Sequence, residues 1–360
     1  MCRGKVEGMA LIGRLKYTTK VLVSHLLYGI GFLQLWQYFA LKRRAVVLMY
    51  HRVLTPTEMR SSGSHPSIMV ECETFAKQMD LVKRRFKVLP IEEFARRIEH
   101  RIPFESSSCL ITFDDGWKDN YTHALPILRA NDIPAVVFLP VNYIGERRHF
   151  WHEALVQLFV LAVRTARKDP ARAERLRAAV AQTGCKDIFD VQDEDPRPHI
   201  IAVLSNNRKG LLPSVIDAAL SDLSRELGVD DGDVDGVDRF MDWDEVRAMA
   251  QAGIEFGGHG AEHRLLSHLP VEEAREDIQR SKEAIDRQVK VGTPTFSYPR
   301  GYWTPQVAEL VKASGFRLAF LAKGGSVGCQ DDPYTLRRIN IGQAGTESMP
   351  MFLARVVGLF

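Results

Sequence analysis

From residue 45 onward, short apolar runs alternate with amphipathic stretches, and this alternation constrains the fold more than any other feature. The apolar runs have the length and composition of buried strands, whereas the stretches between them have helical periodicity. The predicted strands are residues 45–50, 86–90, 109–113, 135–140, 254–258, 295–299, 316–321 and 336–341. Eight strands that alternate with helices favour an α/β fold with parallel strands, as a barrel or as an open sheet.

Three of the predicted helices have clear sequence signals. Residues 91–100 form one, and another is expected between Thr304-Pro305 and Gly315, because Pro favours the first turn and Gly often follows the last. The helix at 271–289 follows a proline and has acidic residues in its first turn. Its apolar face is predicted to contain Val271, Ala274, Ile278 and Ile285.

Residues 150–240 interrupt the alternation. They are strongly charged, mostly helical in pattern, and end in the acidic turn DDGDVDGVD at 230–238. We interpret residues 150–238 as a helical insertion between two strand units, either a lid over a site or a purely structural addition. A chain of 360 residues can bury a large core without covalent links, and its five cysteines include no CxxC pair. The net charge of +3 gives no indication of a nucleic-acid partner.

The N-terminal segment, residues 1–44, contains a long run without formal charge. Residues 21–41 read VLVSHLLYGIGFLQLWQYFAL, between Lys20 and the basic triplet at 42–44. The length is that of a membrane-spanning helix, but the polar and aromatic residues within it are also typical of a helix in the membrane interface. A signal peptide fits poorly, since no cleavage site follows the run. We expect membrane attachment through 21–41; the alternative is an apolar helix packed on the domain.

A pair of carboxylates follows the strand predicted at 109–113. Asp114 and Asp115 precede Gly116, which permits a sharp turn at the end of the strand. In parallel α/β folds, sites form at the carboxyl ends of the strands, so both carboxylates can serve one site there. The alternative is a strand-to-helix turn in which Asp115 caps the helix.

Three histidines follow other predicted strands. His259 and His263 are four residues apart, the spacing that places two imidazoles on one side of a helical turn. Two histidines and a carboxylate are a common catalytic zinc ligand set, although HxxxH alone is often coincidental. The segment is not HExxH, which argues against a metalloprotease. His51 follows the first predicted strand, where it is either functional or simply hydrogen-bonded.

Together these segments resemble one family. The motifs TFDDG at 112–116, HxxxH at 259–263 and FSYPRG at 296–301 occur in an order similar to that of the polysaccharide deacetylase family, carbohydrate esterases with a NodB homology domain. The segments LMYHRV, PAVVFLPVNYIG and MDWDEVRAMAQAGIEFGGH are also similar to that family. The resemblance implies a distorted (β/α) barrel of 7–8 strands over residues 45–345, with the 150–238 insertion. We expect a tail helix at 346–360.

The resemblance also implies a role for each site residue. Asp115, His259 and His263 would hold one divalent metal ion, with zinc as the default. Asp114 would be the general base.

His51 is similar to the N-terminal histidine that supplies the general acid in the branch of the family with a permuted motif order. The backbone N–H of Arg300 would help to bind the oxyanion.

The chain departs from the family pattern in two places. Ser297 stands where the third motif usually begins with an arginine that steadies the base, so we expect Arg337 or Arg338 to substitute for it. The usual C-terminal Leu-x-x-His motif is also missing, since residues 336–339 read LRRI. That second departure makes His51 more necessary as the acid.

The resemblance implies a metal-dependent hydrolase that removes N-acetyl groups from amino sugars of a cell-surface or lipid-linked polysaccharide. The run at 21–41 would associate it with a bacterial membrane, and the balanced charge predicts no nucleic-acid partner. One alternative is the removal of another acyl group, formyl or O-acetyl, from a glycan intermediate. The other is a non-catalytic glycan-binding relic. The missing arginine and C-terminal histidine favour it, and the intact Asp114, Asp115, His259 and His263 argue against it.

Overall fold

The structure is a computed structural model. The chain forms two compact units. The first unit comprises Met1–Thr55, Pro66–Gly145 and Met241–Phe360, and the second comprises Pro56–His65 and Glu146–Phe240. The described residues are 2–105, 107–207, 211–229, 236–290, 292 and 294–360. Most of the predicted acidic turn, residues 230–235, therefore lies outside the described part of the chain.

Seven parallel strands form a curled sheet in the first unit. Their order is β1–β5–β6–β7–β8–β9, and β11 pairs with Leu48 and Met49 of β1 on the edge opposite β5. Their bounds are Arg44–Tyr50 (β1), Ser108–Phe113 (β5), Ala135–Leu139 (β6), Glu255–Gly258 (β7), Thr295–Ser297 (β8), Leu318–Phe320 (β9) and Ile339–Asn340 (β11). Strand β4, Lys87–Val88, pairs in parallel with the start of β5. Each of the eight predicted strand segments thus contains a strand.

The segment 336–340 closes the sheet. Leu336 and Phe320 of β9 form a parallel bridge, and the N–H of Leu336 donates to the carbonyl of Ala319 at 3.0 Å. A few residues later, Ile339 pairs with Leu48 of β1. One segment therefore links the last strand to the first, and the predicted distorted (β/α) barrel is confirmed. The carboxyl ends of all these strands meet at one end of the barrel, where a site can form.

Three short strands were not predicted. Strand β10, Ser326–Gly328, runs antiparallel to β1, while β2, Arg52–Leu54, and β3, Met69–Glu71, form a separate parallel pair. Each has only three residues, too few for a period-two pattern to be recognised in the sequence.

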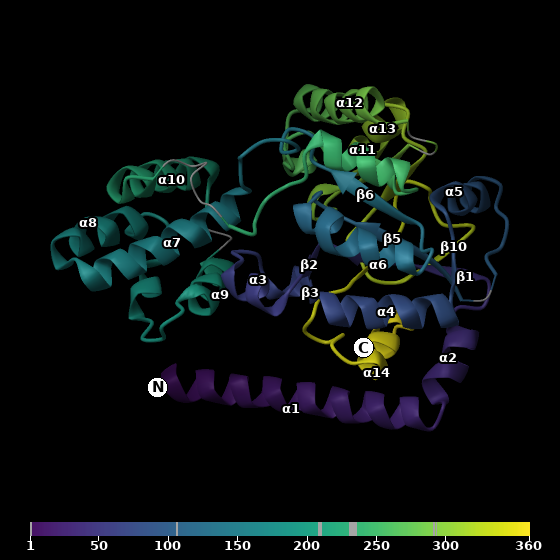
Figure 1. Cartoon of the computed structure of the whole chain (residues 1–360), viewed down its shortest axis with the longest axis horizontal. Coiled ribbons are helices and arrows are strands. Elements are labelled where there is room, and N and C mark those ends of the chain that lie inside the picture. Colours follow the sequence, from purple (N-terminus) through teal and green to yellow (C-terminus); the bar gives the residue numbers. More distant parts are fainter. Residues whose placement is uncertain (1, 106, 208–210, 230–235, 291, 293) are drawn as a thin grey trace. The chain divides into compact units, whose positions relative to one another are not determined.

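In the described part of the chain, six α-helices of the first unit lie between the barrel strands. They are α4 (Cys72–Arg85), α5 (Ile91–Glu99), α6 (Leu125–Ala130), α11 (Trp243–Gln251), α12 (Val271–Gln288) and α13 (Pro305–Ala313). Helices α12 and α13 lie side by side (Figure 1). Ala274, Ile278 and Ile285 of α12 are buried as predicted, but Val271 is exposed because it is the first residue of the helix.

The N-terminal run is divided between two helices, α1 (Cys2–Gly29) and α2 (Phe32–Ala40). The break falls at Gly31, whose φ of 77° is in the left-handed region that glycine adopts readily. Helix α1 runs along α14, Met349–Val356 (Figure 1). Among the residues that the structure describes, none of the helices combines the length and the hydropathy that crossing a membrane would require.

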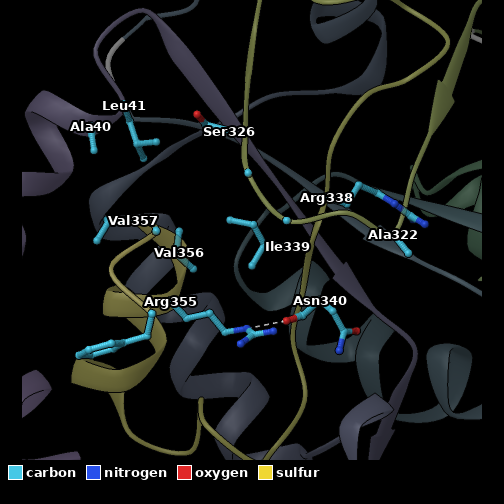
Figure 2. A pocket seen from close by; sticks show the side chains of 14 residues that line it. Ala40, Leu41, Ala322, Ser326, Arg338, Ile339, Asn340, Arg355, Val356 and Val357 are labelled. Carbon is cyan, nitrogen blue, oxygen red and sulfur yellow. Dashed lines mark hydrogen bonds between the residues drawn. The ribbon is translucent and has the colours of Figure 1, made fainter. Parts of the chain in front are cut away.

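The end of α2, the closing segment and α14 surround a pocket of about 520 Å³ (Figure 2). Leu41, Ile339 and Val356 contribute apolar side chains to it, and Arg355 donates from Nε to the carbonyl of Asn340 at 2.8 Å. Asp115, His259 and His263 are not among the residues that line it.

The second unit is helical. Its helices are α3 (Pro56–Ser61), α7 (Trp151–Lys168), α8 (Pro170–Ala181), α9 (Arg197–Asn207) and α10 (Pro213–Leu227). A hydrophobic core that includes Leu158, Leu176 and Leu223 joins α7, α8 and α10. The buried Asp238 carboxylate accepts bonds from Ser62 Oγ and the N–H of Gly63, both at 2.6 Å. This carboxylate ties residues 56–65 to the helical segment.

Candidate active site

Four barrel strands bring the predicted site residues to one end of the barrel. Asp114 and Asp115 follow β5, His259 follows β7, and His51 follows β1. Ser297 is the last residue of β8. The carboxylates and imidazoles that are far apart in the sequence lie within a few ångströms of one another, as the barrel topology predicts.

Asp115 lies at a sharp turn. Its φ of 75° is unusual for a non-glycine residue, and Gly116 continues the turn with a φ of 65°. A Cβ at residue 116 would lie 2.7 Å from Leu139 Cδ2, and together with the positive φ this contact favours glycine there. Trp117 donates from Nε1 to Asp115 Oδ2 at 3.2 Å. The Asp115 side chain does not cap a helix; its carboxylate is directed at two histidines.

His259 is oriented by a backbone carbonyl. Its Nδ1 lies 2.7 Å from the carbonyl oxygen of Ser297, which can only accept, so Nδ1 carries the proton. Its Nε2 is 3.4 Å from Asp115 Oδ1. Burial would lower the pKa of His259, but Asp114 and Asp115 outweigh burial and raise it. A proton and a metal ion would therefore compete for Nε2.

His263 follows a loop rather than a helical turn. Residues 259–263 contain no helix, which corrects the expected helical arrangement of the two histidines. The Asp277 carboxylate of α12 accepts from the N–H groups of Ala261 at 2.7 Å and Glu262 at 3.3 Å. A buried carboxylate that bonds two successive backbone N–H groups fixes the turn. Asp277 was missed in the sequence because it looks like any polar residue of an amphipathic helix.

Asp115, His259 and His263 could hold a metal ion. One donor atom of each lies within 4.8 Å of the others. Asp115 Oδ1 is 3.4 Å from His259 Nε2 and 3.5 Å from His263 Nε2. Ligand atoms at the usual zinc distances lie about 3.3–3.4 Å apart when the coordination is tetrahedral. The donor types and two of the three spacings therefore fit a divalent metal.

Asp114 is held by a buried arginine. Arg338 donates to both carboxylate oxygens of Asp114, from NH1 to Oδ1 at 2.6 Å and from NH2 to Oδ2 at 2.7 Å. Ser297 bridges the pair, since its Oγ accepts from Arg338 at 2.8 Å and donates to Asp114 at 3.3 Å. In Figure 2 the Arg338 side chain points away from Val356 and Val357 of the C-terminal segment. Of the two arginines considered from the sequence, Arg338 makes the contact, while Arg337 is exposed.

The pKa of Asp114 follows from these contacts. Burial would raise it, but the charges of Arg338 and the nearby histidines outweigh burial and lower it. The carboxylate is therefore ionised at neutral pH. Its Oδ2 lies 4.0 Å from His259 Nε2, beside the possible metal ligands.

His51 is half-buried near the same carboxylates. Its Nδ1 is buried and has no hydrogen-bond partner in the described part of the chain. Burial lowers the pKa of His51, and the negative charges of Asp115 and Asp114 oppose this effect only partly. Asn120 donates from Nδ2 to the His51 carbonyl at 2.8 Å, which holds the backbone in place.

Arg300 lies in the turn Pro299–Gly301 that follows β8. Its φ of 56° places its backbone in the left-handed region, and Gly301 follows with a φ of 71°. A Cβ at residue 301 would approach the Ala322 nitrogen to 2.4 Å, so the turn packs closely on the next strand unit.

The match to a family model decides the family. Residues 101–184 and 189–319 match the model described as polysaccharide deacetylase. The chain belongs to the polysaccharide deacetylase family. YxkH of Bacillus subtilis (strain 168), named for the same family, is 19% identical over 303 residues, which cover 83% of this chain and 73% of YxkH.

Two solved structures share the fold of this polysaccharide deacetylase. The Streptococcus pyogenes deacetylase PplD, in complex with acetate, has a TM-score of 0.54 and 16% identity, with 87% of this chain and 98% of PplD covered. IcaB from Ammonifex degensii has a TM-score of 0.53 and 19% identity, with 88% of this chain and 97% of IcaB covered.

As a polysaccharide deacetylase, the protein is a hydrolase of carbon–nitrogen bonds other than peptide bonds, and its family implies an N-acetylated glycan as substrate. The matched residues include Asp114, Asp115 and the two histidines of HxxxH. His51 and Arg338 lie outside the matched residues, so the match does not bear on their roles.

Proposed function

We propose that this deacetylase is metal-dependent and releases acetate from N-acetylated amino sugars of a cell-surface or lipid-linked polysaccharide. The observation that carries this proposal is the cluster of Asp115, His259 and His263 beside the arginine-paired Asp114. Zinc is the proposed metal, because two imidazoles and one carboxylate are a common zinc ligand set that leaves a position open.

A divalent ion bound by these three residues supplies a Lewis acid for the acetyl carbonyl and lowers the pKa of a water molecule. The proposed role of Asp114 is to accept the proton of the water that attacks the acetyl carbon. Its ionised carboxylate suits that role, and Arg338 keeps it oriented. The carbon–oxygen bond forms, the carbon–nitrogen bond breaks, and the departing nitrogen requires a proton.

The proposed donor of that proton is His51. Because burial lowers its pKa, His51 acts as an acid most effectively on the acidic side of neutrality. The backbone N–H of Arg300 is proposed to stabilise the negative oxygen of the tetrahedral intermediate. The support is its position: Arg300 has a left-handed backbone conformation in the turn that directly follows β8.

The Asp114–Arg338 pair also bears on the choice between an enzyme and a glycan-binding relic. The arginine missing from the third motif was one of two arguments for a relic. Arg338 pairs with Asp114 with two short bonds, so the proposed base has an arginine partner after all.

We also propose that the enzyme is associated with a bacterial membrane through residues 21–41. The support is the run of 21 residues without formal charge, from which several large apolar side chains project into solvent.

One assay tests the catalytic proposal. The purified protein is incubated with a panel of N-acetylated and N-formylated oligosaccharides, and acetate, formate and free amino groups are measured. We expect equimolar acetate and amine from the N-acetylated substrates, with loss of both in Asp114→Asn. Formate release that exceeds acetate release would contradict the acyl assignment, and the absence of any release would support the relic.

A further inference from the structure

We propose that helices α1 and α2 bind an anionic lipid surface through a defined set of exposed apolar side chains. This inference deepens the membrane part of the proposed function, but it does not depend on the chemistry of the site. The set is called here the N-terminal apolar face. It consists of Leu22, Leu26, Ile30, Phe32, Leu35, Trp36 and Phe39.

The spacing of these residues places them in stripes along the two helices. Leu22, Leu26 and Ile30 are four residues apart, so they follow one side of α1 and the turn after it. On α2, residues 32, 35, 36 and 39 have the i, i+3, i+4, i+7 spacing of a single helix face. The rings of Phe32 and Trp36 are stacked, with centroids 6.2 Å apart. Leu26, Ile30 and Phe39 have exposed fractions of 64%, 68% and 59%, which a monomer in water does not favour.

Two polar residues of the same run, Ser24 and Gln37, face the protein. Ser24 is fully buried and donates from Oγ to the Lys20 carbonyl. Gln37 is also buried, and its Nε2 donates to the Arg85 carbonyl and to Ser107 Oγ, each at 3.0 Å. These two hydrogen-bonded side chains thus pack inward, while the residues of the N-terminal apolar face project outward. This arrangement suits a helix pair that lies between the barrel and an apolar phase.

The charge of the N-terminal segment indicates what binds the N-terminal apolar face. Residues 1–44 hold eight Lys or Arg and a single acidic residue, whereas the other 316 residues hold 40 Lys or Arg and 44 Asp or Glu. Lys16, Lys20, Lys42 and Arg43 flank the face and are exposed. Basic residues beside an apolar helix face favour anionic headgroups.

A second copy of the chain is the competing occupant. In a two-fold dimer through this face, the same basic residues of both copies would be brought together, because an isologous interface pairs a surface with itself. No acidic residue occurs between Gly8 and Thr57 to offset that repulsion. An anionic bilayer provides both the apolar interior and the opposite charge.

The test is flotation of the full-length chain with vesicles. One set is phosphatidylcholine alone, and the other contains 30 mol% phosphatidylglycerol. Each basic residue near an anionic surface strengthens binding about fivefold, so we expect at least tenfold stronger binding to the anionic vesicles, with a decrease at high salt. Leu26→Glu/Phe39→Glu should weaken binding at least 100-fold, since each large apolar side chain contributes about tenfold or more.

Leu212→Glu is the matched control. Leu212 is an exposed leucine of the helical unit, and its replacement should leave flotation unchanged. Circular dichroism and acetate release from a soluble oligosaccharide should be equal for the wild type and both variants, which separates lipid binding from catalysis. The proposal is overturned if the wild-type chain does not float, or if the double variant floats as well as the wild type. It is also overturned if the wild type forms a dimer without vesicles that the double variant loses.

Discussion

The contact between Arg338 and Asp114 gives the sharpest quantitative prediction. The Arg338→Met variant keeps much of the side-chain length but removes the guanidinium group. Arg338 is fully buried, and its guanidinium bonds the Asp114 carboxylate, Ser297 Oγ and the Leu321 carbonyl. Methionine leaves the carboxylate of Asp114 buried without its cation.

Breaking a buried ion pair by removing one partner costs about 3–5 kcal/mol in the free energy of unfolding. The free-energy cost of desolvating both ions offsets most of their attraction, so the intact pair adds little to stability. The loss in the variant arises because one buried charge remains without its partner. We therefore expect Arg338→Met to lower the free energy of unfolding at pH 7 by about 3 kcal/mol or more. The double variant with Asp114→Asn should be more stable than Arg338→Met, because it leaves no uncompensated carboxylate.

The pH dependence of this loss has a definite sign. In the wild type, the pKa of Asp114 is lowered, so the carboxylate contributes stability that is lost as the pH falls through its folded-state pKa. In Arg338→Met, only the histidines oppose the effect of burial, so we expect the pKa of Asp114 to be raised. Keeping this carboxylate ionised at neutral pH then lowers the stability of the folded variant. The difference between the two proteins should therefore be largest near pH 7 and should decrease toward pH 4.

Urea unfolding at several pH values measures this difference. The control is Arg337→Met, the same substitution at the exposed neighbouring residue, and it should change stability by less than about 0.5 kcal/mol. The rate of acetate release should fall about 10²–10⁴-fold in Arg338→Met, since a protonated Asp114 cannot accept a proton. A loss below about 1 kcal/mol that is independent of pH would refute the assignment of a buried ion pair.

Three further predictions concern groups around the proposed metal ligands. His51→Ala should lower kcat by about 10²–10⁴-fold with unchanged metal content. It should also remove the decline of kcat/KM that the wild type shows above the lowered pKa of His51. Turnover near the wild-type rate would exclude His51 as the acid. Trp117→Phe should weaken metal binding about 10–100-fold in a chelator competition, because Asp115 loses a bond that orients it; unchanged affinity would contradict this role. Asp277→Ala should lower the free energy of unfolding, measured by urea unfolding, by about 1–3 kcal/mol, because two backbone N–H groups lose their acceptor. Equal stability of the variant and the wild type would mean that other groups hold the turn.

Much of the barrel could be predicted because parallel strands are buried on both faces. Runs such as 45–50 and 135–140 are apolar throughout, and the amphipathic helix at 271–289 has the opposite pattern, one apolar face in every turn. The strand ends then place His51, Asp114, Asp115 and His259 at one end of the barrel. Local sequence therefore predicted both the elements and the approximate position of the site.

The contacts that orient the site could not be predicted in the same way. Arg338 meets Asp114 from 224 residues away, and which of two adjacent arginines faces the barrel depends on how the segment 336–340 closes it. Asp277 acts through backbone N–H groups of a non-helical loop, so neither its residue type nor its spacing indicates the role. The HxxxH spacing suggested a helical turn, but glycine at 260 and a left-handed His263 produce a different loop.

The most direct measurement for the central claim is metal content together with activity. The purified enzyme is stripped with a chelator and titrated with zinc, and bound metal and acetate release are recorded at each step. We predict that both rise together to one ion per chain, that His263→Ala loses both, and that His268→Ala, at an exposed histidine five residues further on, behaves as the wild type. Acetate release by the stripped enzyme, or one tightly bound ion per chain in His263→Ala, would contradict the account.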